Sequence, residues 1–372
     1  MASSLKTAHD LAEVIEAHAD DAERQRRLPE PTVRALTDGG FMRMCLPSEY
    51  GGDELDPMTS TAIISALAYA DGAAGWCSMI ASTTSSMAAF LPEAGAREIY
   101  GDLRAVTGGV FAPNGIGTVV DDGVTVSGRW AWGSGTQHCD WILGGARCDD
   151  QTFRLCWFPH DDVTFHDTWH TGGMRGSGSL DYEVGDVVVP HHRTMQPGVT
   201  TPRIDTALFR FPNFSLLAAS VAAVGLGVAR RALDEIVEIA EGKRPQYSSR
   251  TLAKQAYTQI ELARAEGRLR ATQAYLSASL SSAWETVSAG HDASLDQRTD
   301  IRLAAVHAAS EAAAVADVAF TLAGGTAVYD TSVLGRCQRD AHVVTQHIQT
   351  APKLYERVGR LRLGLDDDVS MW

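Results

Sequence analysis

The chain has 372 residues, of which 45% are hydrophobic and 21% charged, and its formal net charge is -14. This length allows a large core and two or three domains, because single hydrophobic cores stop growing at about 250–300 residues. The negative charge, with no concentrated stripe of Lys and Arg, argues against nucleic acid and against an anionic membrane surface as partners.

The first hundred residues place apolar side chains at helical spacing. One helix is expected around residues 11–18, and a second begins at Pro31 and ends at Gly39. Two further helices, rich in small residues, are expected over Thr59–Tyr69 and Trp76–Phe90. The sequence therefore predicts a helical N-terminal domain.

A long uncharged run, Gly72–Pro92, is interrupted by five Ser and Thr residues at Ser82–Ser86. This predicts a buried helix rather than a membrane span. The N-terminal segment is charged and helical in pattern, unlike a signal peptide. We therefore expect a cytoplasmic protein.

From about Ala105 the pattern changes to short alternating segments separated by Gly and Asp. Val119–Val126 contains Asp122-Gly123, a pair that favours the positive φ angles of a tight hairpin turn. Four more strands are predicted, at Trp141–Leu143, Phe153–Leu155, Val163–Phe165 and Val187–Pro190. These segments indicate a compact β domain.

After Pro212 the chain is helical in pattern to its end. Gly225-Leu226-Gly227 lies inside this pattern with no preceding strand, so it indicates close helix packing rather than a dinucleotide-binding loop. Four long helices joined by short loops suggest an antiparallel bundle, whose small residues also favour contacts between subunits. The four are expected at Phe214–Glu241, Leu252–Ala289, Thr299–Leu322 and Cys337–Leu361.

The expected fold class is therefore α+β. It combines an N-terminal helical domain (1–104), a central β-barrel or sandwich domain (105–212) and a C-terminal four-helix bundle (213–372). The cysteines lack a CxxC pair and are predicted to be free thiols in a reducing compartment. They are Cys45, Cys77, Cys139, Cys148, Cys156 and Cys337. No metal site is predicted, since the pair His166 and His170 is not in a helical context.

The segment Gly128–Gly135 places two indoles, Trp130 and Trp132, beside small residues and a hydroxyl, Gly133 and Ser134. An isoalloxazine ring needs flat walls, a close backbone approach and a hydrogen-bonding group at its ring nitrogens. The alternative interpretation is a strand whose Trp residues belong to the core.

A second candidate lies near the C-terminus, where Asp340 and His347 fall in a helical pattern on about the same face. A histidine has an ordinary pKa of about 6.5, which suits proton transfer at neutral pH. The alternative is an ordinary, partly buried helical histidine.

At these residues the chain resembles a known family, the acyl-CoA dehydrogenase fold, over nearly its whole length. Several of the stretches are specifically similar to the branch made of two-component monooxygenases that depend on reduced flavin. The stretches that carry the resemblance are Leu46–Gly52, Tyr69–Cys77, Gly128–Trp141, Thr168–Pro190 and Gly324–Asp340.

One position separates the branches of this fold. Many acyl-CoA dehydrogenases carry a catalytic glutamate shortly after the Arg-Asp of the last helices. Counting from Arg339-Asp340, this chain has His347 there, as the monooxygenases do, and Glu356 is out of register. The alternative, an acyl-CoA dehydrogenase-like flavoenzyme that oxidises a thioester, needs a carboxylate from elsewhere; a catalytically silent scaffold is a third possibility.

The resemblance implies a flavin-dependent monooxygenase. Reduced FMN or FAD, not covalently bound, comes from a separate NAD(P)H:flavin reductase and reacts with O2 to give a C4a-hydroperoxyflavin. The oxygen then hydroxylates a small aromatic or heterocyclic substrate or oxidises its nitrogen or sulfur.

The resemblance also implies roles for individual residues. Ser134 is expected to hydrogen-bond near flavin N5, with Trp130 or Trp132 walling the ring beside Gly133. His347 is expected either to deprotonate the substrate or to hold the peroxide proton. The substrate side is expected at Trp76, Thr83, Thr84 and His347.

The flavin phosphate is expected at the loop between the first two bundle helices, with Lys243, Arg244 and Arg250 as candidate ligands; the alternative is a solvated charged loop. Gly324 and Gly325, in a stretch that carries the resemblance, are also expected to contact the cofactor. A homotetramer is expected. One departure is that Ile80–Ser86 lacks the second active-site histidine that some relatives carry.

Overall fold

Seven α-helices precede the sheet in the computed structural model, which describes residues 2–369 and 372. Two of them, α5 and α6, begin at the aspartates Asp56 and Asp71, whose side chains accept hydrogen bonds from the backbone N–H groups of Thr59 and Ala74. The predicted helix Trp76–Phe90 is α6 followed by the short 3₁₀ turn Ser86–Phe90. The helices are α1 Ala2–Asp10, α2 Ala12–Ala17, α3 Ala19–Gln25, α4 Glu30–Asp38, α5 Pro57–Ala70, α6 Gly72–Ser85 and α7 Glu93–Tyr100.

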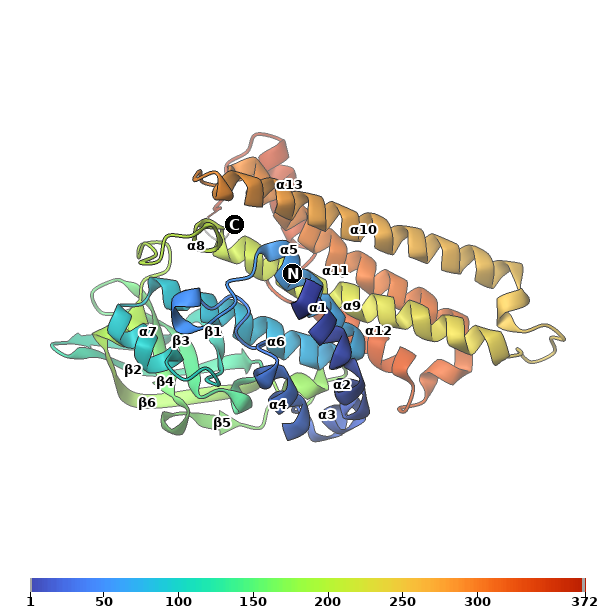
Figure 1. The fold of residues 1–372 in the computed structure, drawn as a ribbon, viewed down its shortest axis with the longest axis horizontal. Helices are drawn as coiled ribbons and strands as arrows, with labels where there is room; N and C mark the ends of the chain where they lie inside the picture. Colours follow the sequence, from blue (N-terminus) through green and yellow to red (C-terminus); the bar gives the residue numbers. More distant parts are fainter. Residues whose placement is uncertain (1, 370–371) are drawn as a thin grey trace.

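The middle of the chain forms one seven-stranded sheet in the order β5-β6-β2-β1-β3-β4-β7. The β1–β3 pair is parallel and the other pairs are antiparallel. Figure 1 shows the sheet at one end of the molecule and the long helices extending away from it. The strands are β1 Thr107–Val120, β2 Gly123–Gly133, β3 Trp141–Cys148, β4 Phe153–Pro159, β5 Thr164–His166, β6 Leu180–Pro190 and β7 Thr194–Met195.

The predicted hairpin is present, but its turn geometry differs from the expectation. Strands β1 and β2 are joined at Asp121-Asp122, with Val120 paired to Gly123. None of the turn residues has a positive φ. Gly123 is needed for another reason, because a Cβ there would lie 2.1 Å from the carbonyl oxygen of Val189 on β6. Close strand approach, rather than a left-handed turn, explains this glycine.

The C-terminal region is a helical bundle around α9, which packs against α5, α6, α11 and α12. The two glycines of the predicted packing motif lie at contacts. A Cβ on Gly225 would lie 3.2 Å from that of Ala312, and one on Gly227 would lie 2.2 Å from the carbonyl oxygen of Ser65. The helices are α8 Ala207–Arg210, α9 Asn213–Gly242, α10 Ala256–Ser288, α11 Leu295–Ala323, α12 Val333–Val344 and α13 Leu354–Arg362.

The expectation of one continuous helix over Cys337–Leu361 is wrong. α12 ends at Val344, and α13 begins only at Leu354. Thr350 donates its hydroxyl to the carbonyl of Val344, and its backbone N–H bonds to the carbonyl of His347. These bonds satisfy carbonyl groups at the helix end and stabilise a loop between the two helices.

Helix α6 is the element shared by the sheet and the bundle. It packs on β1 on one side and on α9 on another, and it contacts the short 3₁₀ turn Arg175–Ser177. Nearly all of its side chains are buried. The six cysteines are free thiols, as predicted, and all six are buried. A site built from α6, the end of β2 and the α12–α13 loop therefore stands on a well-packed frame.

Two helical segments in the described part of the chain are long and apolar enough to cross a bilayer by composition alone. They are α9 and the segment Leu295–Val328, whose most apolar windows are 83% and 56% buried within the protein. Core helices of globular proteins have the same composition.

Candidate active site

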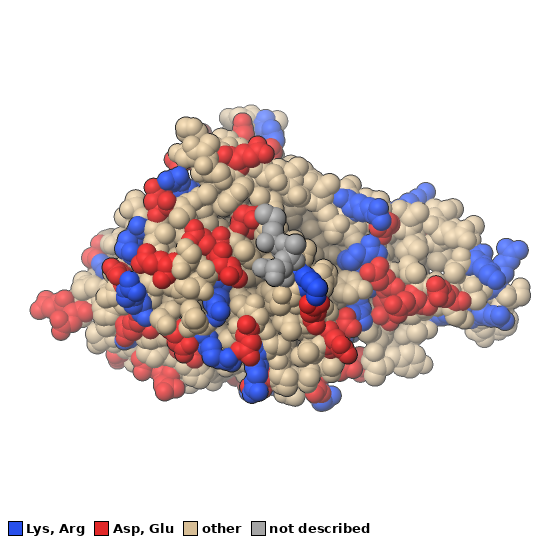
Figure 2. Space-filling view, viewed as in Figure 1, with Lys and Arg blue, Asp and Glu red and all other residues tan. Residues whose placement is uncertain are grey.

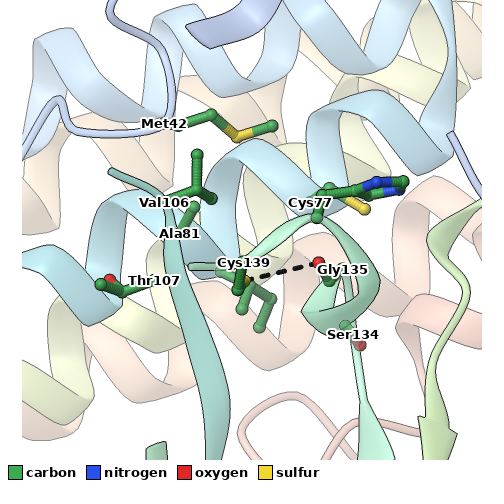
Figure 3. A pocket seen from close by; sticks show the side chains of 10 residues that line it. Met42, Cys77, Ala81, Val106, Thr107, Ser134, Gly135 and Cys139 are labelled. Atoms are coloured by element: carbon green, nitrogen blue, oxygen red, sulfur yellow. Dashed lines mark hydrogen bonds between the residues drawn. The ribbon is translucent and has the colours of Figure 1, made fainter. Parts of the chain in front are cut away.

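Strand β2 ends in a tight turn that presents Ser134. The backbone N–H of Ser134 bonds to the carbonyl of Trp132, and Gly135, with φ of +68°, donates its N–H to the backbone carbonyl of Ser177 at 2.8 Å. Ser134 is 7% exposed. Figure 3 shows Ser134 and Gly135 at this turn, near Cys77 and Cys139. The turn fixes the hydroxyl group close to α6.

The two indoles of β2 have different environments. Trp130 is fully buried, stacks on Tyr182 with ring centroids 5.3 Å apart, and donates its indole N–H to Gly145. Trp132 is 73% exposed and has a φ of +66°, which is unusual for a bulky residue. The next position, 133, requires glycine, because a Cβ there would lie 2.6 Å from the Tyr182 ring. Trp130 thus packs as a core residue, and only Trp132 presents a free aromatic face.

Trp76 connects the two predicted catalytic residues. Its indole N–H donates to the hydroxyl oxygen of Ser134 at 2.9 Å. Its ring meets the imidazole of His347 edge to face, with centroids 5.6 Å apart and planes at 77°. Trp76 is 6% exposed and lies in α6. The structure therefore brings Ser134, Trp76 and His347 together from three parts of the chain.

His347 lies in the loop after α12, so the expectation that it shares a helix face with Asp340 is wrong. Its Nδ1 accepts the backbone N–H of Gln349 at 3.2 Å, which assigns the proton of the neutral ring to Nε2. Burial, helped by the positive charge of Arg302, lowers the pKa of His347 from 6.5 to about 4. The imidazole is therefore neutral at pH 7 and a weaker base than the sequence suggests.

Arg302 supports the same loop. It is 2% exposed and donates to the backbone carbonyl of Gln349 at 3.0 Å and to its side chain. Burial lowers the pKa of Arg302 to about 10. The guanidinium therefore remains charged at neutral pH, which adds to the preference of His347 for its neutral form.

Three serine hydroxyls form a chain that the sequence analysis did not identify. Ser134 contacts Ser179 at 2.7 Å, Ser179 contacts Ser177 at 2.7 Å, and Ser177 donates to the carbonyl of Met174 at 2.7 Å. The pairing of Gly133 in β2 with Leu180 in β6 brings these segments together. The only signal in the sequence was the motif Ser-Gly-Ser at residues 177–179.

Asp340 is buried beside the turn at Met174. Its carboxylate accepts the backbone N–H of Met174, and a Cβ on Gly72 would lie 3.0 Å from its Oδ2. Burial raises the pKa of Asp340 to about 7, and the nearby Asp71 carboxylate adds to the rise. Asp340 therefore anchors the Met174 turn rather than contacting His347.

The cavity beside Ser134 is small. It has a volume of about 10 Å³ and is lined by ten residues that include Ile80, Thr107, Ser134 and His138, which is room for about one water molecule. A larger groove of about 630 Å³ lies between α1, α5, α9 and α10 and contains none of the predicted site residues.

The predicted substrate residues Thr83 and Thr84 lie near the end of α6. Thr83 is partly buried, and its hydroxyl donates to the carbonyl of Met79 within the helix at 2.8 Å. Thr84 is 2% exposed, and its carbonyl accepts the hydroxyl of Tyr100. Thr83 thus retains only its acceptor lone pairs for a ligand.

The predicted phosphate residues lie at the other end of the molecule. Arg244 and Arg250 are exposed in the loop after α9, at the end of the bundle remote from the sheet (Figure 1), and Figure 2 shows basic side chains there. Lys243 joins this loop to the turn after α11 by donating to Thr326. Gly324 and Gly325 in that turn have open space around their Cα atoms. One protomer therefore does not bring these four residues to Ser134.

The features around Ser134 fit a flavin ring. Trp132 offers an exposed aromatic face held in a strained backbone conformation, and such strain is typical of functional positions. Ser134 offers a hydroxyl beside it that the indole N–H of Trp76 holds in place, and the neighbouring His347 supplies a second polar group. A flat ring with hydrogen-bonding nitrogens matches this combination.

Family models confirm the fold. Residues 5–99 match the acyl-CoA dehydrogenase N-terminal domain, and residues 219–352 match the acyl-CoA dehydrogenase C-terminal domain. The solved structure of XiaF from Streptomyces sp., in complex with FADH2 and glycerol, superposes with a TM-score of 0.93 at 25% identity. That match covers 99% of this chain and 96% of XiaF.

Characterised relatives identify the branch. An indole-3-acetate monooxygenase of Pseudomonas putida is 35% identical over 94% of this chain and 90% of its own length. The oxygenase subunit HsaA of a flavin-dependent monooxygenase, from Rhodococcus jostii (strain RHA1), is 29% identical over 95% of this chain and 97% of its own length. The chain therefore belongs to the two-component, flavin-dependent monooxygenases built on the acyl-CoA dehydrogenase fold, and it is an oxygenase that uses reduced flavin and O2.

Proposed function

We propose that this oxygenase hydroxylates a small aromatic or heterocyclic compound, or oxidises its nitrogen or sulfur, with reduced FMN or FAD supplied by a separate NAD(P)H:flavin reductase. The observation that carries the proposal is the contact of Trp76 with both Ser134 and His347 beside the exposed Trp132. An indole-3-acetate monooxygenase among the relatives supports an aromatic substrate.

Each residue of the site has a role in this proposal. When bound, reduced flavin activates O2 and supplies the oxygen atom that is transferred. Trp132 forms a flat wall, and Ser134 bonds to the ring at N5, held in place by Trp76. His347, neutral and protonated on Nε2, donates a hydrogen bond to the substrate or to the transferred oxygen. Thr83 and Thr84 lie on the substrate side.

The phosphate residues serve a flavin held by another copy of the chain. The loop after α9 and the turn after α11, which carry Arg244, Arg250, Gly324 and Gly325, lie at the end of the bundle remote from the sheet (Figure 1). Guanidinium groups and an open glycine turn suit a phosphate or a nucleotide. We therefore propose a homotetramer in which neighbouring copies complete each cofactor site. We also propose that the chain has three domains, 1–104, 105–212 and 213–372. We propose a cytoplasmic location, because a reducing compartment keeps the six thiols free.

A reductase-coupled assay under ¹⁸O₂ tests this function. The purified protein is combined with an NADH-dependent flavin reductase, FMN or FAD, and a panel of indole-3-acetate, simple phenols and aryl thioethers. We expect one class to gain a single ¹⁸O atom by mass spectrometry, with little H2O2 release. Ser134→Ala should raise H2O2 and lower product. Failure to label any of the three classes, together with turnover of acyl-CoA thioesters, would overturn the proposal.

A further inference from the structure

We infer that Ser177 and Ser179 are positioning residues that make the Ser134 oxygen a hydrogen-bond acceptor toward the flavin, so that the site favours the reduced ring over the oxidised ring. The inference rests on the proposed function in one respect, which is that Ser134 faces the ring at N5. It adds two residues that touch neither flavin nor substrate.

The chain of hydroxyls is buried along its length. Ser134, Ser179 and Ser177 are 7%, 3% and 1% exposed. Successive oxygens are 2.7 Å apart, and the last hydroxyl is 2.7 Å from the carbonyl oxygen of Met174. At the other end, the indole N–H of Trp76 is 2.9 Å from Ser134. The chain thus runs between a fixed donor and a fixed acceptor.

Each hydroxyl carries one proton, and this fixes the order of the bonds. If Ser177 donates to Met174, then Ser179 must donate to Ser177, and Ser134 must donate to Ser179. In this direction all four contacts, including the one from Trp76, are hydrogen bonds. Ser134 has then used its proton and offers only a lone pair to a ligand.

The opposite direction loses one bond within the protein. For Ser134 to donate to a ligand, Ser179 must donate to Ser134 and Ser177 to Ser179, which leaves no hydroxyl proton for Met174. The Met174 carbonyl keeps two other donors, the indole N–H of Trp169 and the backbone N–H of Ser177, each at 3.0 Å. The cost is therefore one net hydrogen bond, equivalent to about a fivefold change in binding.

The turn that ends the chain is firmly held. Met174 and Gly178 both have positive φ angles, +49° and +53°, and the backbone N–H of Met174 bonds to the buried carboxylate of Asp340. The carbonyl of Met174 therefore has a fixed direction toward Ser177. Both ends of the row of serine hydroxyls are therefore fixed. A ligand at Ser134 encounters the hydroxyls donating toward Met174, because this direction forms more hydrogen bonds within the protein.

The two redox states of flavin differ at this atom. N5 of the reduced ring carries a hydrogen and donates, whereas N5 of the oxidised ring has only a lone pair and accepts. An accepting Ser134 therefore matches reduced flavin. Binding of oxidised flavin requires the chain to reverse or leaves two lone pairs facing each other, which weakens the oxidised complex.

Equilibrium binding tests the inference without turnover. Dissociation constants are measured for oxidised FMN in air and for photoreduced FMN under anaerobic conditions, and then for the two states of FAD. Ser177→Ala frees the proton of Ser179 to turn toward Ser134, and Ser179→Ala removes the acceptor of the Ser134 proton. Either variant should lower the ratio of the oxidised to the reduced dissociation constant by about fivefold.

Ser85→Ala is the matched control. Ser85 is a buried serine of the neighbouring helix α6 whose hydroxyl bonds to the carbonyl of Ser82, outside the chain. It should leave the ratio unchanged. An unchanged ratio in both Ser177→Ala and Ser179→Ala, or an equal loss of affinity for both redox states, would overturn this inference and leave the proposed function intact. A wild-type protein that binds neither FMN nor FAD in either state would overturn the proposed function together with it.

Discussion

Replacing His347 by Gln and, separately, by Ala distinguishes a hydrogen-bond donor from a base. The fall of its pKa from 6.5 to about 4 weakens the imidazole as a base by about 3 kcal/mol, since one pKa unit corresponds to about 1.4 kcal/mol. Nδ1 is already occupied by the backbone N–H of Gln349, which leaves Nε2–H as the group free to act. A glutamine can replace that donor but cannot replace a base.

We expect His347→Gln to retain kcat/KM within about fivefold of the wild type, and His347→Ala to lose about 10- to 100-fold, the worth of one hydrogen bond of 1.5–3 kcal/mol. The assay is product formation with saturating reduced flavin from pH 5.5 to 8.5. The wild-type profile should show no ionisation of this group near pH 6.5. The reasoning fails if both variants lose about 100-fold or more and only the wild type has an ionisation near pH 6.5.

Three predictions concern stability. Burial lowers the pKa of His138, like that of His347, to about 4. Because the unfolded chain binds these protons from about pH 6.5 downward, the free energy of unfolding should fall as pH drops from about 6.5 to 4. Urea unfolding at pH 7 and 5 measures this. The raised pKa of Asp340 gives the opposite sign, because between about pH 4 and 7 the folded protein keeps a proton that the unfolded chain releases, so its contribution to stability falls as pH rises through this range. Asp340→Asn should remove this contribution and make the slope of unfolding free energy against pH more positive between about pH 4 and 7, and an unchanged slope would contradict it. Gly227→Ala should destabilise the protein by about 1–3 kcal/mol, because the new Cβ would meet a carbonyl oxygen. Gly267→Ala, at an exposed helical position with open space, should stabilise it by about 0.5–1 kcal/mol. Equal changes in the free energy of unfolding would refute the packing argument.

Helices and strands with strong periodicity could be predicted from the sequence, whereas local breaks could not. Trp130 and Trp132 are two residues apart, so regular alternation places both on one face of β2. The positive φ of Trp132 breaks that alternation and moves its indole into solvent. The end of α12 depends similarly on Thr350, whose hydroxyl bonds to a carbonyl six residues earlier.

The candidate site was only partly predictable for the same reason. Ser134 and His347 were identified individually from their motifs, but their connection through Trp76 depends on packing between distant segments. Ser177 and Ser179 reach Ser134 only through the pairing of β2 with β6. The lowered pKa of His347 likewise depends on burial and on Arg302, which lies 45 positions before it in the chain.

The backbone conformation at Trp132 opposes thermal stability to the proposed flavin binding. A glycine adopts a φ of +66° without steric cost, and an indole that is 73% exposed contributes little burial. Selection for thermal stability alone would therefore favour Trp132→Gly by about 1 kcal/mol, while it removes the aromatic wall of the proposed flavin site. Directed evolution of this fold should hold position 132 constant, or screen for flavin retention at every round.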